Sequence, residues 1–356
     1  MKFTSVYLLF VCFLYPLYAV QGIIVACSDK YVPTCFPSLV YLRDCIGCSL
    51  PIEVWYAGDE LSEKSKLLLK TCGVELKDLC QIYSDHQEEL RGFHSKPLAL
   101  AATAFDQVIL MDADLFFFSD PSIIFSHSRF IETGAFFFRD RFEVKYCGYG
   151  KQPRYSAHGD WAPSYQYVHR ETLFRELIES PSQYVPPDWR HYWTDERPSF
   201  LNPFPSEHQE SSCLVVDKKR HTRGIENLLI LNTTRRKHVY SVVYGDKETY
   251  WLAFEMAKEP YFINEEAPLR LYGEWVENDY ERSSIEMIHF IDGKMFMASK
   301  PPIDFGTNPL FVSSRLPLFP DFENLSEKER RSPTFEELRE LKKMLFYYKS
   351  LEGSRL

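Results

Sequence analysis

The chain has 356 residues, of which 45% are hydrophobic and 16% aromatic, and its formal net charge is -9. This length and composition suffice for one large α/β domain or two smaller ones. The acidic balance argues against nucleic-acid binding, which needs a basic patch. The sequence contains neither a GxxxxGK[ST] nor a GxGxxG loop, so phosphate binding would need a metal or individual side chains.

The N-terminus has the pattern of a targeting segment. Lys2 is followed by an uncharged apolar stretch, residues 3–22. We expect residues 1–21 to be a signal peptide or a short signal anchor. The pattern leaves cleavage open, so the mature chain would be either secreted or a type II membrane protein, held in the membrane through this segment. In both cases it would enter the secretory pathway.

Nine cysteines agree with that compartment. Cys45-x-x-Cys48 followed by Cys72 and Cys80 resembles a zinc site, but the second spacing is too wide for the usual knuckle. We therefore expect disulfides among the first six cysteines after the leader, with Cys72 and Cys80 oxidised. Two N-glycosylation sequons begin at Asn232 and Asn324, and either could be unused.

Strand and helix patterns alternate along the chain. Strands are expected at 23–27, 52–56, 81–83, 108–111, 133–138, 260–264 and 285–291, and another after a tight turn within 210–217. Helices are expected from 37, at 63–72, from 97 to 105, near 171–178, at 218–231 and after a polar turn within 245–254. This order favours a mainly parallel sheet with right-handed crossovers and helices on both faces.

The run at 108–111 is unbroken and apolar, as is typical of a strand buried on both faces. Asp112 and Asp114 follow it, and residues two apart on a strand point to the same side. Ligands bind at the carboxyl ends of strands in open α/β sheets, and a divalent cation that holds a diphosphate needs oxygen ligands there. The alternative is that these carboxylates cap a turn or pair with Arg or Lys. Two acids between apolar runs are costly without charge compensation, which favours the cation.

Two later features bear on the same site. The strand expected at 285–291 presents His289 just before Asp292-Gly293-Lys294. A lone histidine on such a strand is usually a core residue, but the acidic pair upstream and the Gly-Lys turn favour a third metal ligand.

Residues 146–205 are rich in Tyr, Trp, Pro, His and Arg with little periodicity. This segment is either an aromatic-lined loop for sugar rings or a surface loop packed by its own aromatic residues.

Taken together, the motifs resemble a GT-A glycosyltransferase, and more closely the MNN-type α-mannosyltransferases of the fungal Golgi. The matching stretches are Glu53-Val-Trp-Tyr-Ala-Gly-Asp59, Phe93-His-Ser-Lys-Pro97, Leu110-Met-Asp-Ala-Asp-Leu-Phe116, Asp120-Pro121, Glu210-Ser211 with Val215-Val-Asp-Lys218, and Gly245-Asp-Lys-Glu-Thr249. One departure is Ser211-Ser212-Cys213, where the resemblance leads us to expect Ser-Gly-Gln, and the membrane stem is nearly missing.

The resemblance implies a Rossmann-like α/β fold with a single catalytic domain, at 22–325. The apolar spacing of Phe335, Leu338, Leu341, Leu345 and Tyr348 separately predicts an amphipathic C-terminal helix within 326–356. It implies Mn²⁺, a GDP-mannose donor, a glycan acceptor, a retaining transfer and a Golgi-lumen location. Asp112 would hold the ribose or a metal-bound water, Asp114 would ligate the metal, and His289 would complete the metal site.

The remaining candidates serve the donor and the acceptor. Lys96, Lys247 and Lys294 would supply positive charge to the donor phosphates. Glu210 and Asp246 are the catalytic candidates, gripping donor hydroxyls or orienting the acceptor. A glycogenin-like transferase that uses a UDP-sugar stays open, as does an inactive carbohydrate-binding GT-A domain. A nucleotidyltransferase fits less well, because residues 26–30 are not a Gly-rich loop.

Overall fold

The computed structural model describes residues 19–83, 90–140, 142–144, 171–193, 204–205, 208–266, 268–272, 284–299, 311–313, 315–317, 330–331, 339 and 343. The predicted leader lies outside these residues except for its last three. Most of the predicted C-terminal segment 326–356 also lies outside them. Arg339 and Lys343 are helical as predicted, whereas Arg330–Arg331 form a short strand and not part of a helix. Within the described ranges, no helix combines the length and the apolar character needed to span a membrane.

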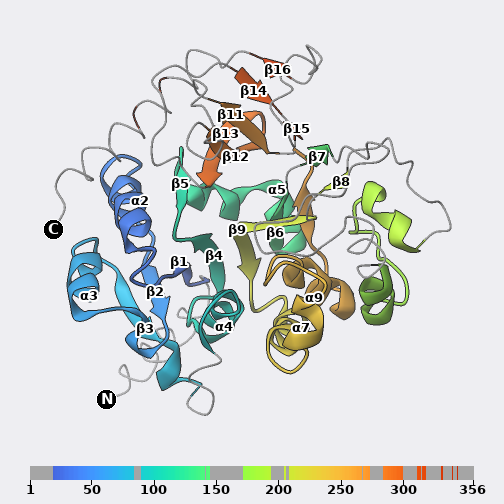
Figure 1. Ribbon diagram of the computed structural model, residues 1–356, viewed down its shortest axis with the longest axis horizontal. Helices are drawn as coiled ribbons and strands as arrows, with labels where there is room; N and C mark the ends of the chain where they lie inside the picture. Colours follow the sequence, from blue (N-terminus) through green and yellow to red (C-terminus); the bar gives the residue numbers. More distant parts are fainter. Residues whose placement is uncertain are drawn as a thin grey trace, which may run out of the picture.

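A seven-stranded sheet forms the centre of the molecule (Figure 1). Its order is β10 (Phe262–Asn264), β6 (Ala135–Arg139), β9 (Gln209–Asp217), β4 (Gln107–Asp112), β1 (Gln21–Ala26), β2 (Ile52–Tyr56) and β3 (Glu75–Asp78). β9 runs antiparallel to both of its neighbours, and the other pairs are parallel. The prediction of an α/β fold of GT-A type with a mainly parallel sheet is confirmed.

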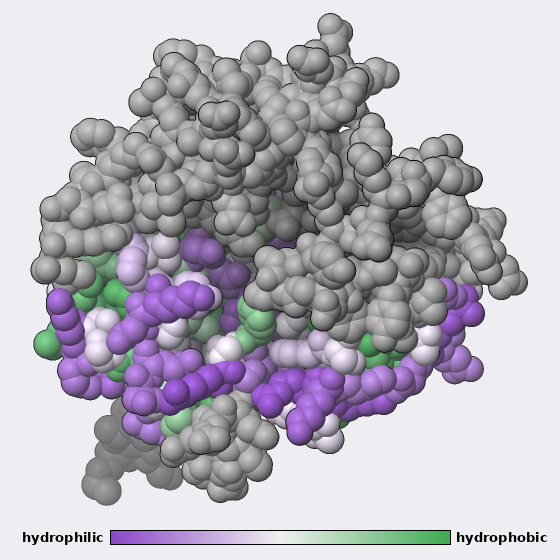
Figure 2. Space-filling view, viewed as in Figure 1, coloured by the Kyte–Doolittle hydropathy of each residue, from purple (hydrophilic) through white to green (hydrophobic). Residues whose placement is uncertain are grey.

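Helices cover both faces of this sheet because strand side chains alternate between them. Val108 and Leu110 pack in one core with helices α4 (Ser95–Ala102), α7 (Thr222–Asn232) and α9 (Thr249–Ala257). Ile109 and Met111 pack in the other core with α2 (Val32–Asp44), α3 (Glu63–Lys70) and α5 (Ser128–Thr133). The strand β4 is therefore buried on both faces, as its unbroken apolar run predicts. Figure 2 shows mostly hydrophilic residues on the described surface of the same view.

A second sheet of six antiparallel strands stands above the first in Figure 1. Its order is β16 (Arg330–Arg331), β14 (Phe311–Ser313), β11 (Leu269–Tyr272), β12 (Ser284–Ile291), β13 (Lys294–Ser299) and β5 (Leu115–Phe117). A small third sheet contains β15 (Arg315–Pro317), β7 (Phe142–Val144) and β8 (Phe204–Pro205). The sequence pattern did not predict the second sheet. β5 follows β4 after a turn, so the chain passes from one sheet to the other at Asp112 and Asp114.

Short helices complete the described part: η1 (Gly58–Glu60), η4 (Pro121–Ser126), residues 171–177, η5 (Pro187–Trp193) and α8 (Arg236–Tyr240). The strand predicted at 81–83 is wrong. The edge strand is β3, and residues 79–81 form the 3-10 helix η2 (Leu79–Gln81). β3 pairs on one side only, with β2, so its charged side chains stay half-exposed and hide the strand pattern.

Two predicted starting points are also wrong. The helix expected from Pro37 begins at Val32, because Pro33 takes the first helical positions and Pro37 lies inside α2. The tight turn expected near Ser211 is instead part of the continuous strand β9. The irregularity lies in its pairing with β6, where the register shifts between Phe137 and Phe138.

The cysteines of the described ranges are free thiols, including Cys72 and Cys80. Cys72 packs in the core that contains α3, whereas Cys80 packs against the core on the opposite face of the sheet. The sheet separates the two thiols, so the predicted oxidation of this pair is not found in the structure.

Candidate functional site

One edge of the central sheet gathers most of the predicted site residues. Asp112 lies at the carboxyl end of β4, and Asp140 directly follows the carboxyl end of β6. Because β9 is antiparallel, Glu210 at its amino end lies at the same edge, paired with Phe138. The topology thus places three carboxylates on neighbouring strands.

Lys96 cross-links this edge to the loop before α9. It lies in the first turn of α4 and is buried. Its Nζ donates to Asp112 Oδ1 at 2.8 Å and to Ser211 Oγ at 3.3 Å, and lies 3.1 Å from Asp246 Oδ2. Burial alone would lower the pKa of Lys96, but the two carboxylates outweigh burial and raise it. The ammonium is therefore charged at all relevant pH values.

Lys247 makes a second cross-link of the same kind. Its Nζ donates to Asp140 Oδ2 at 2.8 Å and to Glu210 Oε2 at 3.3 Å. The other oxygen of Glu210 accepts from the backbone N–H of Ser212 at 2.7 Å. Both carboxylates are buried, so the lysine supplies the charge that their burial requires.

Asp246 is the least exposed acid that Lys96 contacts, at 1%. The Tyr250 hydroxyl donates to its Oδ2 at 2.7 Å, the oxygen that also faces Lys96. Burial raises the pKa of Asp246, and Lys96 opposes that rise. Tyr250 and Lys96 together fix Oδ2 of this carboxylate.

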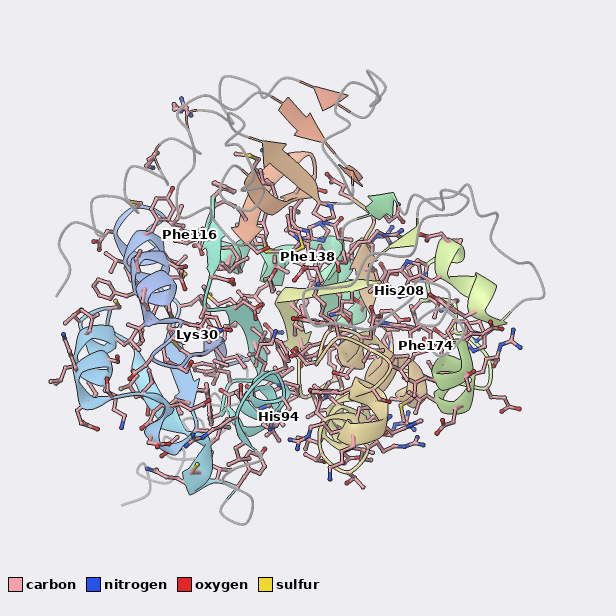
Figure 3. The ribbon with its side chains drawn as sticks, in the orientation of Figure 1. Lys30, His94, Phe116, Phe138, Phe174 and His208 are labelled. Carbon is pink, nitrogen blue, oxygen red and sulfur yellow. The ribbon has the colours of Figure 1, made fainter. Side chains whose placement is uncertain are left out.

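His289 lies beside this cluster on the second sheet. Strand pairing sets it opposite Met297 of β13, which pairs with Phe117 of β5, two strands away. The His289 side chain is fully buried against the ring of Phe138, at 5.2 Å between centroids, and Figure 3 marks Phe138. Neither of its ring nitrogens has a hydrogen-bond partner among the described residues.

Electrostatics connect His289 to the lysine cross-links. Burial lowers the pKa of His289 to about 4; Glu210 partly opposes this and Lys247 adds to it. At neutral pH the imidazole is therefore uncharged, with a lone pair available to a ligand. Burying an imidazole without hydrogen-bond partners costs free energy, and a bound group that contacts its nitrogens would remove that cost.

The donor set fits a divalent cation in its chemistry. Asp112 and Asp114 flank Ala113 in the turn between β4 and β5, and His289 supplies a neutral nitrogen. In this structure the three side chains do not form a metal site. The described residues contain no group of three or more His, Cys, Asp or Glu side chains that could hold a metal ion.

The structure brings together five of the predicted residues: Lys96, Asp112, Glu210, Asp246 and Lys247. Lys294 lies exposed at the turn between β12 and β13, with no contact to the others among the described residues. Sequence reasoning missed Asp140 and Tyr250. Asp140 carried a usable signal, because it follows the apolar strand 135–138 much as Asp112 follows 108–111.

Comparisons with known proteins bear on this site. The chain is 29% identical over 185 residues to "Putative alpha-1,3-mannosyltransferase MNN12" of Candida albicans, covering 52% of this chain and 20% of that protein. It is 23% identical over 260 residues to "Alpha-1,3-mannosyltransferase MNT3" of Saccharomyces cerevisiae, covering 68% of this chain and 39% of that protein. The matches thus span well under half the length of these relatives.

Among solved structures, core-mannan synthase A from Aspergillus fumigatus in its Mn/GDP form aligns at a TM-score of 0.39 and 9% identity. The alignment covers 67% of this chain and 70% of that one. A family model described as "Mannosyltransferase putative" matches residues 20–291, which is most of this chain. The match includes every residue of what we call the lysine–carboxylate cluster: Lys96, Asp112, Asp140, Glu210, Asp246 and Lys247. The chain belongs to this mannosyltransferase family.

Proposed function

We propose that this chain is a metal-dependent, retaining α-mannosyltransferase that moves mannose from GDP-mannose to a glycan acceptor in the secretory pathway, in the Golgi lumen. The observation that carries the proposal is the convergence of Lys96, Asp112 and Asp246 at the carboxyl edge of the sheet, in a member of a mannosyltransferase family. The names of the relatives, which are α-mannosyltransferases, favour mannose as the sugar.

The cluster holds more carboxylates than lysines, so a donor diphosphate would need a cation beside it. Four carboxylates share two lysines, so each lysine already serves two acids. Lys96 and Lys247 would stay charged beside the donor phosphates. Asp246 would accept a hydroxyl of the donor sugar, and Glu210 would orient the acceptor. Neither acid is proposed as a covalent nucleophile.

Asp112, Asp114 and His289 would hold Mn²⁺. When bound, the cation would act as a Lewis acid that stabilises the departing diphosphate. The chain's own contribution is to keep His289 neutral, through a burial that lowers its pKa to about 4, and to position Asp112 through its hydrogen bond from Lys96. Lys294, exposed at its turn, would meet the phosphates only from the solvent side.

Thermal unfolding with nucleotides tests the proposal without an acceptor. A ligand that binds only the native state at a hundredfold excess over its Kd adds about 2.7 kcal/mol to the unfolding free energy. For a domain of this size we expect a rise in melting temperature of a few degrees. The rise should occur with Mn²⁺ plus GDP, should be much smaller with UDP, and should vanish with EDTA, because the carboxylates would then repel the diphosphate.

Asp114→Asn should abolish both this stabilisation and mannose transfer, since an amide keeps the shape and loses the charge. Asp292→Asn is the matched control, because it makes the same charge change at an exposed turn whose φ of 51° suits asparagine. Stabilisation by UDP equal to that by GDP would replace the donor with a UDP-sugar. No stabilisation by any nucleotide would refute the transferase in favour of an inactive carbohydrate-binding domain.

A further inference from the structure

Asn232 has the sequence of a glycosylation site and the surroundings of a buried core residue. It opens the sequon Asn232-Thr233-Thr234 and is the last residue of α7. Its exposed fraction is 0%. The side-chain nitrogen, to which a glycan would be joined, donates to Leu228 O at 2.8 Å and to Thr249 Oγ1 at 3.0 Å. The side-chain oxygen accepts from the Tyr240 hydroxyl at 2.6 Å.

These bonds lead directly to the lysine–carboxylate cluster. Thr249 accepts from Asn232 and donates through the same hydroxyl to the backbone carbonyl of Asp246, at 2.7 Å. Asp246 in turn faces Lys96. The side-chain amide of Asn232 thus fixes the direction of the Thr249 hydroxyl. That hydroxyl holds the turn from which Asp246 and Lys247 project, together with the backbone N–H of Thr249, which donates to the same carbonyl at 2.9 Å.

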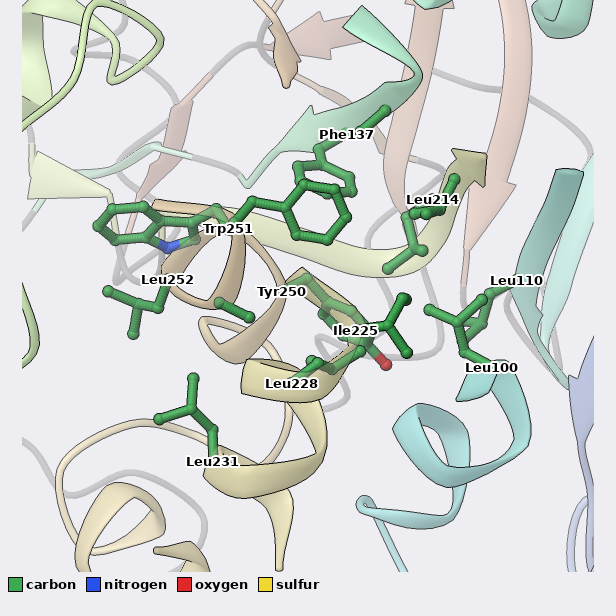
Figure 4. Packing of buried hydrophobic residues seen from close by; sticks show 14 of the residues in the cluster. Leu100, Leu110, Phe137, Leu214, Ile225, Leu228, Leu231, Tyr250, Trp251 and Leu252 are labelled. Atoms are coloured by element: carbon green, nitrogen blue, oxygen red, sulfur yellow. The ribbon is translucent and has the colours of Figure 1, made fainter. Parts of the chain in front are cut away.

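Asn232 is buried where α7 packs against α9. α7 and α9 lie side by side, and Figure 4 shows Leu228 and Leu231 of α7 in the same packed layer as Tyr250 of α9. Leu231 and Tyr250 are fully buried. A glycan on Asn232 would have to separate these two helices, and it would replace one of the two N–H hydrogens that bond Leu228 O and Thr249 Oγ1. Buried polar groups left without partners would add to that cost.

We propose that Asn232 is a positioning residue of the transfer site, which sets the turn bearing Asp246 and Lys247, and that the folded protein carries no glycan on it. The positioning part rests on the proposed function. The modification part does not, since it follows from the burial and the hydrogen bonds of Asn232 alone.

Thr234 makes the modification part testable, because it is exposed and completes the sequon. The full chain is expressed in a host that N-glycosylates a co-expressed reporter, and the folded fraction is mapped by peptide mass spectrometry. We expect Asn232 to be unmodified in the wild type and in Thr234→Ala, and the two proteins to share the same melting temperature and transfer rate. A glycan on Asn232 in folded protein would overturn the inference.

The positioning part needs variants matched for stability. Asn232→Ala and Leu231→Ala remove neighbouring buried side chains of α7, and both should lower the melting temperature. Only Asn232→Ala should also lower kcat, by about tenfold to a hundredfold, because a small misplacement of Asp246 is enough. Equal losses of kcat at equal losses of melting temperature would show a merely structural role and refute the positioning.

Thr249 supplies variants that separate the hydrogen bond from the packing, should Asn232→Ala fail to fold. Thr249→Val keeps the shape and interrupts the path to Asp246, so it should lower kcat as Asn232→Ala does. Thr249→Ser keeps the hydroxyl and should restore kcat. An equal kcat in both variants would contradict the proposal. If the wild type transfers no sugar at all, the proposed function fails, and the glycan mapping alone then decides the assignment of Asn232.

Discussion

Removing the charge of Lys96 is the perturbation that most directly tests the lysine–carboxylate cluster. Methionine keeps nearly the length of the side chain and loses its ammonium. Asp246 would then be left in a position where 2% of its side chain is exposed, whereas Asp112, at 29%, can be rehydrated. Removing one partner of a buried ion pair costs about 3–5 kcal/mol. We expect Lys96→Met to lie at the lower end of that range, because Tyr250 still donates to Asp246.

The loss should depend on pH with a definite sign. Burial raises the pKa of Asp246, and without Lys96 to oppose it the pKa rises further. A carboxyl whose pKa is higher in the folded than in the unfolded state binds more protons when folded, so the unfolding free energy increases as the pH falls. The deficit of Lys96→Met relative to the wild type should therefore be smaller at pH 5 than at pH 8.

Urea unfolding of a double-mutant cycle measures the effect. Asp246→Asn added to Lys96→Met removes the stranded charge and should recover most of the lost stability. Lys64→Met is the control, since Lys64 is exposed on α3 and its loss should stay within about 0.5 kcal/mol. The reasoning is refuted if Lys96→Met is as stable as Lys64→Met, or if Asp246→Asn brings no recovery.

Three further predictions concern single contacts. Burial lowers the pKa of His289 to about 4, so the unfolded state takes up a proton before the folded state does. The unfolding free energy should therefore fall by up to about 3 kcal/mol between pH 6.5 and 4. In EDTA, His289→Gln should show a weaker dependence of the unfolding free energy on pH, and an equal dependence would contradict this. Gly245→Ala should lower the melting temperature and slow transfer, since φ is 58° and a Cβ would lie 2.8 Å from the Phe93 side chain. Gly47→Ala is the control: its φ is 76° but a Cβ would meet open space, so it should lower the melting temperature only modestly. Tyr250→Phe should cost about 1.5–3 kcal/mol in urea unfolding through the lost hydrogen bond to Asp246, and a cost near zero would show that the bond is not formed.

The sequence was informative wherever a local pattern decided the structure. The run at 108–111 predicted a buried strand with Asp112 at its end, and the strand at 285–291 carries His289 as expected. The edge strand β3 was missed because pairing on one side places few demands on its side chains. The second sheet was missed because β5 pairs with β13, nearly two hundred residues further along the chain, and no local pattern records such a partner.

The same division holds for the candidate site. Lys96, Asp246 and Lys247 could be singled out one by one, but their partners depend on how β6, β9 and α9 meet. Asp140 becomes the partner of Lys247 only because β9 is antiparallel and brings Glu210 beside the end of β6. The sequence named both lysines as candidates for phosphate contacts, and the structure adds that each of them also contacts two carboxylates.

The contacts of Lys96 and Lys247 with carboxylates connect the stability of the fold to the proposed chemistry. Lys96 joins α4 and β4 to the loop before α9, and Lys247 joins that loop to β6 and β9. Asp246 and Lys247 are adjacent in the sequence, so one turn takes part in both cross-links, and Asn232 holds that turn through Thr249. A ligand that draws either lysine toward its own phosphates must leave an acid to be satisfied by something else. A cation at Asp112 and a sugar hydroxyl at Asp246 would do so together, which is a physical reason for metal and donor to bind cooperatively at this site.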